Sequence, residues 1–313
     1  MAHSESVICV MDDLAQIKPA KDTSFALMLE AQRRGLPVWY ANEGDLQADR
    51  HGVYARLQRV RLHDRAHDWF EVESHCERAL GRGDLVLMRC DPPVDADYIY
   101  ATMLLERAEA AGATVINAPR SLRDFNEKLA ILRFPDLIAP TLVASDPETL
   151  REFVREHGKV VLKPLDGMGG RGIFMATDND PNLSVILETL TGEGRHPAMA
   201  QRFLPGIRDG DKRVLIVGGE VVPYMLARIP GERDFRGNLA RGGRGVGLPI
   251  GTAERRVAEA VAPELLANGI LFAGIDIIDG HLTEVNVTSP TCVRELDREF
   301  GLNIAALLYD RLP

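Results

Sequence analysis

Segment 276–289, with the sequence DIIDGHLTEVNVTS, carries three oxygen-bearing side chains that could act together. The apolar residues on both sides of the Asp-Gly pair at 279–280 indicate two strands joined by a tight hairpin. Strand side chains alternate between faces, so the length of the turn decides which of them meet. An odd-length turn places Asp276, Glu284 and Asn286 on one face, as an oxygen set that suits Mg²⁺. A two-residue turn would separate Asp276 from Glu284, and the alternative is a hairpin with a solvated polar face.

The glycine-rich loop 163–172, KPLDGMGGRG, is a candidate phosphate site. Glycine lets backbone N–H groups approach phosphate oxygens. The flanking stretches 159–163 and 172–176 indicate strands, whereas a Walker A loop or a Rossmann turn must open a helix. We therefore predict a flexible hairpin that folds over phosphates, with an ordinary hairpin turn as the alternative. Lys163 favours the first interpretation, because an unpaired charge among apolar neighbours costs several kcal/mol.

Three further signals are weaker. Lys128 lies on a helix predicted from Ser121 onward, and a solvated lysine is the alternative. Residues 198–206 indicate a strand that runs into a linker, where extended backbone could bind adenine; a plain interdomain linker is the alternative. Asp211 and Arg213 place an acid and a base just before the next apolar strand.

The stretch 228–247 is dense in arginine and glycine. Glycine makes such a segment mobile, and arginine suits it to carboxylates and phosphates. We predict that 229–244 is a lid that closes over a charged intermediate. A disordered basic loop is the alternative.

The elements that must position these residues change in character along the chain. In the first third, strands and helices alternate, which predicts a mainly parallel sheet covered by helices. The predicted strands are 7–11, 36–40, 84–89 and 113–117, and the predicted helices are 24–34 and 98–112. The stretch 42–83 is polar and irregular, and no element is assigned to it.

A second unit begins near Ser121, where Asp124 three residues later indicates a capped helix start. A further helix is predicted from Asp146-Pro147 to Gly158, with proline in its first turn. The last third consists of strands separated by glycine-rich turns, plus a helix at 252–268.

The composition excludes several functions. With 45% hydrophobic residues, 27% charged residues and a net charge of −9, the chain is typical of a globular protein without broad affinity for nucleic acid or membrane. No apolar run approaches the ~20 residues that span a bilayer. The N-terminus lacks the pattern of a secretion signal. The four cysteines show no CxxC spacing, so we expect cytosolic thiols rather than disulfides or zinc ligands.

These motifs, in this order, resemble the bacterial glutathione synthetase family of the ATP-grasp superfamily. The likeness rests on segments 21–25, 87–93, 126–128, 162–170, 209–213, 226–230, 237–239 and 282–290, and it spans nearly the whole chain. ATP-grasp ligases in general share the glycine loop and the Glu-x-Asn pair. The combination of MR-x-DPP with LARIP is specific to this family. Cys90 departs from the pattern, since the family usually has lysine there, and this puts any cationic role at that position in doubt.

The resemblance implies an N-terminal parallel-sheet (pre-ATP-grasp) domain at 1–120, followed by an ATP-grasp fold. The two α+β subdomains of that fold would be 121–200 and 201–313. The implied reaction joins γ-glutamylcysteine and glycine to glutathione through an acyl phosphate, with release of ADP and phosphate. It also implies ATP as co-substrate, Mg²⁺ (or Mn²⁺ in its place), a homo-oligomer and a cytoplasmic location.

The resemblance also assigns residues to roles. The ATP-binding residues would be Lys128, Lys163, Asp166, Gly167, Gly169, Gly170, Gln201, Arg202, Phe203, Leu204 and Asp211. The substrate-binding residues would be Arg89, Asp91, Arg228, Asn238, Ser289 and Pro290. Arg213, Arg228 and Arg236 would act in catalysis, and Asp276, Glu284 and Asn286 would bind the metal.

Two alternatives remain open. Another ATP-grasp ligase, such as a dipeptide or amino-acid-tailing enzyme, would share the loop and the metal residues but not MR-x-DPP. A degenerate ATP-grasp protein would bind nucleotide without turnover, although the presence of Asp276, Glu284 and Asn286 argues against it.

Overall fold

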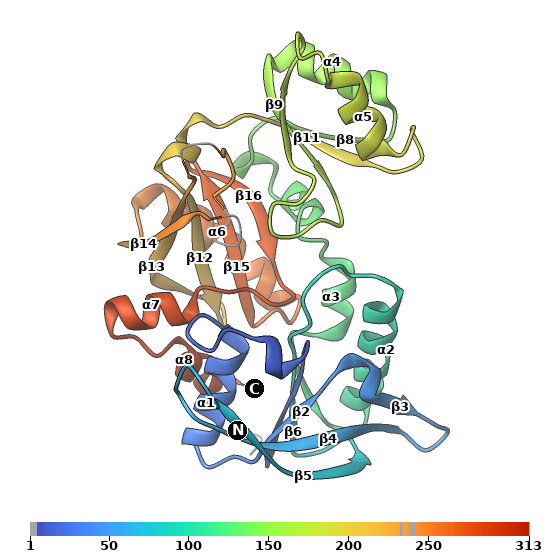
Figure 1. The fold of residues 1–313 in the computed structure, drawn as a ribbon, viewed down its shortest axis with the longest axis vertical. Helices are drawn as coiled ribbons and strands as arrows, with labels where there is room; N and C mark the ends of the chain where they lie inside the picture. Colours follow the sequence, from blue (N-terminus) through green and yellow to red (C-terminus); the bar gives the residue numbers. More distant parts are fainter. Residues whose placement is uncertain (1–4, 232–233, 238–241, 313) are drawn as a thin grey trace.

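A computed structural model describes residues 5–231, 234–237 and 242–312. Figure 1 shows three units stacked along the longest axis of the molecule, each built on its own sheet. The N-terminal domain lies at one end, the unit of β8–β11 at the other, and the unit of β12–β16 between them. In the part of the chain described, no helix combines the length and hydrophobicity needed to cross a bilayer.

The N-terminal sheet has a parallel core. Its strands are β1 (Ser6–Val10), β2 (Val38–Ala41), β6 (Asp84–Met88) and β7 (Thr114–Ile116), in the order β2-β1-β6-β7. Alternate residues of β1 face opposite sides: Val7 and Cys9 belong to the core that holds α1 (Thr23–Arg33), and Ile8 and Val10 to the core that holds α2 (Ala96–Ala110). The predicted parallel sheet is thus confirmed.

The unassigned stretch 42–83 forms an antiparallel extension of this sheet. It contains β3 (Leu46–Ala48), β4 (Val53–Leu62) and β5 (Phe70–Ala79), with β3 and β5 both paired to β4. β5 is exposed at most positions, so it lacks the apolar alternation that announces a strand. Ion pairs across the strands, such as Arg59 with Glu73 at 3.1 Å, contribute to the pairing instead.

The unit at the far end is an antiparallel sheet in the order β10-β9-β11-β8. Its strands are β8 (Thr141–Ala144), β9 (Lys159–Pro164), β10 (Phe174–Thr177) and β11 (Ala198–Arg202), and its helices are α4 (Pro147–His157) and α5 (Leu183–Thr191). The predicted helix after Asp146 is confirmed, because the Asp146 side chain accepts from the Thr149 N–H and Gly158 ends the helix. The strands on both sides of the glycine loop are confirmed as a hairpin.

The prediction for Lys128 was wrong in its element. Helix α3 (Pro119–Asp124) begins before Ser121 and ends before Lys128. Ser121 donates from Oγ to the Asn268 carbonyl and caps nothing. The side chain of Asn126 accepts from the N–H groups of Lys128 and Leu129, and this starts a separate 3-10 turn at Leu129–Arg133.

The central unit is an antiparallel sheet in the order β14-β13-β12-β15-β16. Its strands are β12 (Asp211–Val217), β13 (Glu220–Ile229), β14 (Arg244–Pro249), β15 (Phe272–Ile278) and β16 (His281–Asn286). Helix α6 (Thr252–Ala267) packs on this sheet, as predicted for 252–268. Helices α7 (Val293–Phe300) and α8 (Ile304–Asp310) return to α1 of the N-terminal domain, as Figure 1 shows. Further 3-10 turns lie at Leu14–Gln16, Glu43–Asp45, Pro135–Leu137 and Pro205–Asp209.

The three sheets fall largely within the predicted domains 1–120, 121–200 and 201–313, although β11 ends at Arg202. The exact limits of those domains stay a prediction.

Candidate active site

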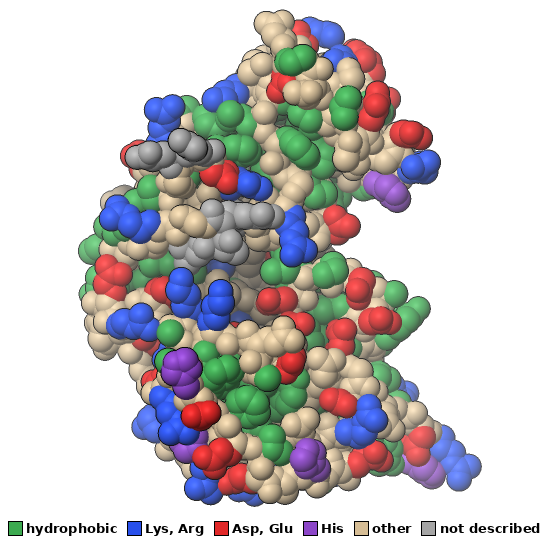
Figure 2. All heavy atoms as spheres, viewed as in Figure 1, with side chains coloured by type: hydrophobic (Ala, Val, Ile, Leu, Met, Phe, Trp, Pro, Cys, Tyr) green, Lys and Arg blue, Asp and Glu red, His purple; other side chains and the backbone are tan. Residues whose placement is uncertain are grey.

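A cavity of about 390 Å³ lies between the two antiparallel units, next to the N-terminal domain. Figure 2 shows the molecular surface hollowed between the unit of β8–β11 and the N-terminal domain. Strands β9 and β11 supply residues to one side of the cavity, and β12, β13 and β16 to the other. Segment 288–292 and the Asp91-Pro92 pair complete it. Most of the residues predicted for the site therefore face one space.

The hairpin of β15 and β16 places the predicted metal residues on one face by means of a β-bulge rather than an odd-length turn. Ile278 pairs with His281, so the turn has two residues, and the predicted need for an odd-length turn was wrong. A β-bulge at Thr283 supplies the missing offset, because two residues of β16 then oppose one of β15. Asp276 therefore pairs with Glu284, and Asn286 lies on the same face.

Asp276 is held by two arginines. It is 2% exposed, and its Oδ2 lies 2.9 Å from Arg213 Nη2 and 2.8 Å from Arg228 Nη2. Asn286 Nδ2 donates to the same oxygen at 3.2 Å. Burial alone would raise the pKa of Asp276, but the two guanidinium groups hold it below the usual range. Asp276 thus supports the floor of the site and does not line the cavity.

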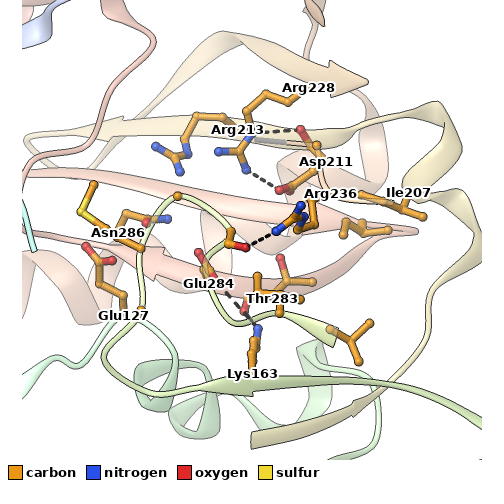
Figure 3. A pocket seen from close by; sticks show the side chains of 18 of the residues that line it. Glu127, Lys163, Ile207, Asp211, Arg213, Arg228, Arg236, Thr283, Glu284 and Asn286 are labelled. Carbon is orange, nitrogen blue, oxygen red and sulfur yellow. Dashed lines mark hydrogen bonds and ion pairs between the residues drawn. The ribbon is translucent and has the colours of Figure 1, made fainter. Parts of the chain in front are cut away.

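Glu284 faces the cavity between two lysines, and Figure 3 shows it next to Lys163. Its Oε1 lies 3.8 Å from Lys163 Nζ and 4.0 Å from Lys128 Nζ, which are ion-pair rather than hydrogen-bond distances. Lys163 Nζ donates to the Thr283 carbonyl at 3.3 Å, and Lys128 Nζ to the Gly167 carbonyl at 2.5 Å. Both lysines are buried, so the alternative of a solvated Lys128 is wrong. Burial lowers the pKa of Lys163, and the charge of Glu284 opposes that shift.

The oxygens available to a cation are those of Glu284 and Asn286. Among the described residues, no group of three or more His, Cys, Asp or Glu side chains is close enough to hold a metal alone. Asp211 adds a buried Oδ1 that has no hydrogen-bond partner, while its Oδ2 lies 2.5 Å from Arg228 Nη2. Hard oxygen donors with an unpartnered carboxylate oxygen nearby fit a divalent cation that also takes oxygens from a bound phosphate.

Arg213 and Arg228 form the opposite wall. Figure 3 shows Arg228 bonded to Asp211, with Arg213 beside Arg228 and both across the cavity from Lys163. Burial lowers the pKa of Arg228, but the charges of Asp211 and Asp276 outweigh that effect and raise it. Burial raises the pKa of Asp211. Both arginines are therefore fixed positive charges at the cavity surface.

The predicted lid contacts the glycine loop. Arg236 Nη1 donates to the Gly170 carbonyl at 2.7 Å, and Arg236 also pairs with Asp234 at 2.8 Å. Gly237 lies against the backbone of β13, where an added Cβ would come 2.3 Å from the Arg228 carbonyl oxygen. The described residues 235–237 of the predicted lid thus line the cavity together with the glycine loop. Asn238, predicted to bind substrate, lies outside the described residues.

A mostly apolar wall lies beside the predicted adenine segment. Gln201, Arg202, Phe203 and Leu204 all line the cavity, with Ala139, Val161 and Ile207 nearby. Gln201 Nε2 donates to Thr141 Oγ1 at 3.0 Å, which orients the amide. Lys159 Nζ lies 4.1 Å from the centre of the Phe203 ring. Apolar side chains thus predominate in this part of the cavity.

The structure separates the residues predicted to bind substrate. Asp91, Ser289 and Pro290 line the cavity, and Ser289 Oγ donates to the Asp91 carboxylate. Arg89 is buried outside it, where Nη2 donates to the Pro290 carbonyl at 2.9 Å and Nε to Ser24 Oγ at 3.0 Å. Arg89 therefore holds the segment that carries Ser289. Asp166 is exposed and also lies outside the lining.

The chain is similar to known proteins over nearly its whole length. The family described as "Prokaryotic glutathione synthetase, N-terminal domain" matches residues 6–123, and its ATP-grasp domain matches residues 127–301. The chain belongs to the prokaryotic glutathione synthetase family. The curated glutathione synthetase of Xanthomonas campestris pv. campestris is 54% identical over 309 residues, covering 99% of this chain and 98% of that protein. That of Pseudomonas syringae pv. tomato is 50% identical, covering 97% and 95%.

Solved structures show the same architecture at low identity. The D-cycloserine synthetase DcsG has a TM-score of 0.66 at 15% identity, covering 98% of this chain and 100% of that one. The ATP-grasp ligase PsnB, complexed with minimal precursor, has a TM-score of 0.63 at 19% identity and covers 100% of both. These likenesses establish the fold alone and confirm the predicted ATP-grasp architecture.

Membership of this family settles the class of activity. The chain is an ATP-dependent carboxylate–amine ligase of glutathione biosynthesis, and it acts on small molecules with ATP and a divalent metal. The alternative of a nucleotide-binding protein without turnover is therefore wrong, and so is that of a ligase from another family.

The sequence analysis missed several residues that line the cavity, among them Glu127, Thr283, Ile207 and Cys292. Glu127 stood within the Asn-Glu-Lys motif at 126–128, where only Lys128 was singled out. Thr283 is the extra residue of the β-bulge, and no local sequence pattern predicted that bulge.

Proposed function

We propose that the chain joins the cysteinyl carboxylate of γ-glutamylcysteine to the amine of glycine, with Mg²⁺ and ATP. One observation carries the proposal: Glu284 and Asn286 face one cavity together with Lys163, Arg213 and Arg228. Such a site offers metal-ligating oxygens and fixed cations side by side. This arrangement suits transfer of a phosphoryl group to a carboxylate.

The nucleotide would lie between the two antiparallel units. Gln201 to Leu204 would take the adenine, and Lys128 and Lys163 the phosphates, under the loop with Gly167, Gly169 and Gly170. The burial of both lysines supports this, since each needs an anionic partner. Glu284 supplies part of that charge at 3.8–4.0 Å, and a phosphate would supply the rest.

Glu284 and Asn286 would hold the metal. Asp276, predicted as the third ligand, lies behind the cavity lining and would support Asn286, whose Nδ2 donates to Asp276 Oδ2. A divalent cation there would neutralise charge on the phosphates as the phosphoryl group moves. We propose Mg²⁺, because all the donors are hard oxygens, and Mn²⁺ is compatible with the same set. Asp211, whose buried Oδ1 is unpartnered, supports a further positive charge in this part of the cavity.

The chemistry would proceed in two steps without a nucleophilic side chain. The donor carboxylate attacks the γ-phosphate to give an acyl phosphate and ADP, and the amine then displaces phosphate to form the amide. Arg213 and Arg228 neutralise the oxygens that gain charge in both steps. Positioning of the reactants accounts for up to about 7–11 kcal/mol of barrier lowering. Closure of Arg236 and its neighbours over the cavity keeps water from the acyl phosphate.

The donor would lie toward the N-terminal domain. Asp91, Ser289 and Pro290 line that end of the cavity, and Arg89 fixes Pro290 through its carbonyl. We therefore assign Arg89 a positioning role rather than direct contact with the donor. Cys90 is buried, which is compatible with a small apolar filler at this position.

We also propose a cytoplasmic homo-oligomer. All four cysteines are free, as in a reducing compartment. Tyr100 and Met103, one turn apart on α2, are 60% and 49% exposed, which suits an interface between subunits. Light scattering coupled to size-exclusion chromatography measures the assembly, and a monomeric mass at micromolar concentration would refute this part of the proposal.

A coupled ADP assay tests the reaction. We expect ADP and phosphate release in equal amounts only when γ-glutamylcysteine, glycine, ATP and Mg²⁺ are all present, and mass spectrometry should identify glutathione. Release that requires a different donor or a different amine would overturn the assigned substrates. Replacing Mg²⁺ by Mn²⁺ or Ca²⁺ tests the choice of metal.

A further inference from the structure

Glu127 differs from the other carboxylates around the nucleotide end of the cavity, because no described basic side chain forms an ion pair with it. Asp211 pairs with Arg228 at 2.5 Å, and Glu284 lies 3.8 Å from Lys163 Nζ. In the part of the chain described, no ion pair within 4.0 Å includes Glu127, although its side chain lines the same cavity. Asp91, at the donor end, is the second lining carboxylate without such a pair.

Glu127 is held firmly in this position. Thr288 Oγ1 donates to its Oε1 at 2.8 Å, and its backbone carbonyl accepts from the Val285 N–H at 2.9 Å. The neighbouring Lys128 bonds elsewhere, to the Gly167 carbonyl. Figure 3 shows Glu127 beside Asn286, on the same side of the cavity as Glu284. Burial raises the pKa of Glu127, and the charge of Glu284 adds to that shift.

A carboxylate shielded from water requires a cation or strong donors. The nucleotide brings only negative charge. In the proposed function Lys128 and Lys163 bind its phosphates, and Arg213 and Arg228 neutralise the transferring group. The amine acceptor of a carboxylate–amine ligase brings a positive charge, because a free amino acid is an ammonium ion at neutral pH. Of the carboxylates at this end of the cavity, Glu127 is the one without an ion pair within 4.0 Å among the described residues, although the more distant charges of Lys128 and Arg213 oppose the rise in its pKa.

We propose that the Glu127 carboxylate binds the ammonium group of the amine acceptor. Glu127 then holds the acceptor beside Asn286 and Glu284, next to the proposed path of phosphoryl transfer. Thr288 fixes one carboxylate oxygen and leaves the other for the ammonium. The inference rests on the proposed function for the identity of the acceptor, glycine, but only on the established ligase class for the presence of an amine.

The test compares a charged acceptor with an uncharged one. In Glu127→Gln the amide oxygen still accepts from Thr288, but the negative charge is gone. We expect the KM for glycine to rise about tenfold or more, which is the effect of losing one charge-assisted hydrogen bond. The KM for γ-glutamylcysteine and the Kd for Mg·ADP should stay within about twofold. Hydroxylamine is largely uncharged at neutral pH, so hydroxamate formation from the acyl phosphate should match the wild type.

Three control variants separate binding from support of the fold. Glu127→Asp keeps the charge and should recover much of the glycine affinity. Thr288→Val removes the hydrogen bond but not the charge, and should raise the KM for glycine less than Glu127→Gln does. Glu156→Gln makes the same chemical change at an exposed position of α4, outside the cavity, and should leave the KM for glycine unchanged.

Several outcomes would overturn the inference. One is an unchanged KM for glycine in Glu127→Gln. Another is an equal loss with hydroxylamine, and a third is a weakened Kd for Mg·ADP, since either would place Glu127 in the metal site or the fold. If the wild type requires an amine other than glycine, the proposed substrate is wrong, whereas the role of Glu127 is then decided by the KM of that amine in the same variants.

Discussion

At the scale of single residues, Glu284 lies where the proposed metal and phosphate sites meet. Its Oε1 lies 3.8 Å from Lys163 Nζ and 4.0 Å from Lys128 Nζ, so one carboxylate faces both cations. The pair of lysines would repel each other without this charge. Glu284 therefore has an electrostatic role before any ligand binds, in addition to its proposed role as a metal ligand.

We predict that Glu284→Gln lowers turnover by about 100-fold or more, because it removes a charged metal ligand worth several kcal/mol of transition-state stabilisation. The fold should survive, since Glu284 makes only long ion pairs. Phosphate release and the thermal midpoint measure the two effects. Glu156→Gln, on the exposed side of α4, is the control and should change neither. Near-wild-type turnover in Glu284→Gln would refute the metal assignment.

Other residues show how much position matters at this scale. Lys128 and Lys163 were singled out by type, and the structure buries both beside Glu284, although only Lys163 lines the cavity. Arg89 was also singled out by type, but its bonds to Ser24 and Pro290 remove it from the cavity. A guanidinium group within a recognisable motif can thus serve the architecture rather than the ligand.

At the scale of elements, the predicted lid between β13 and β14 approaches the backbone of β13 closely at Gly237. A Cβ added to Gly237 would lie 2.3 Å from the Arg228 carbonyl oxygen, which is backbone and cannot rotate away. Gly231, also in the lid, has nothing within 4 Å of such a Cβ. The two glycines therefore form a matched pair for testing closure.

We predict that Gly237→Ala holds the lid away from β13, slows amide synthesis several-fold and raises the ratio of phosphate released to amide formed, since water reaches the acyl phosphate. Gly231→Ala should keep the wild-type ratio. The measurement is phosphate and product from the same reaction mixture. Equal ratios in both variants would show that the close approach at Gly237 has no role in closure.

At the same scale, the register of the hairpin of β15 and β16 decides which side chains share a face. The turn at Asp279-Gly280 was predicted correctly as a turn, and its two residues alone would have put Asp276 and Glu284 on opposite faces. The bulge at Thr283 reverses that outcome. Thr283 and Glu284 consequently both line the cavity.

At the scale of the whole molecule, Asn117 joins the N-terminal domain to the central sheet. It is buried, and its Nδ2 donates to the carbonyls of Phe272 and Val287, each at 2.7 Å. Its Oδ1 accepts from the N–H groups of Leu271 and Phe272, each at 2.9 Å. One side chain thus satisfies backbone groups at the ends of β15 and β16.

We predict that Asn117→Ala lowers the free energy of unfolding by about 3 kcal/mol, because it leaves buried backbone groups unsatisfied. Equilibrium urea unfolding measures the loss. Asn182→Ala changes an exposed asparagine that makes no side-chain cap and should stay within about 0.5 kcal/mol of the wild type. Equal stabilities of the two variants would contradict the stabilising role of the Asn117 hydrogen bonds.

Glu30 connects α1 to α8 and makes stability depend on pH. Bonds from Arg33, Arg34 and Asn303 lower its pKa to about 2, against the opposing effect of burial. A lowered pKa stabilises the fold above the unfolded-state value of 4.5, and that contribution is lost as pH falls toward about 2. We predict that Glu30→Gln costs about 2 kcal/mol at pH 7, a figure reduced for solvent screening at the exposed Arg33.

Urea midpoints at pH 7, 4 and 3 test this dependence. The difference between wild type and Glu30→Gln should shrink steadily below pH 4.5, the unshifted value for glutamate. A difference that stays constant over this range would mean that Glu30 acts through packing rather than charge.

The sequence by itself determined what depends on neighbours along the chain. The Asp146 cap, the parallel strands and the hairpin around the glycine loop follow from periodicity, capping and motif, all of which act over a few residues. The proposed metal and phosphate residues were also singled out by motif. A charged and exposed strand such as β5 was not predicted, because it carries no apolar alternation.

Only the tertiary structure decided which distant groups share a partner. The pairing of Asp276 with Arg213 and Arg228, the contact of Arg236 with Gly170, and the hydrogen bond from Thr288 to Glu127 join residues that lie far apart in the sequence. A single bulge at Thr283 decided the register of the whole hairpin. Such outcomes depend on contacts in space, because a side chain of given type binds whichever group packing brings to it.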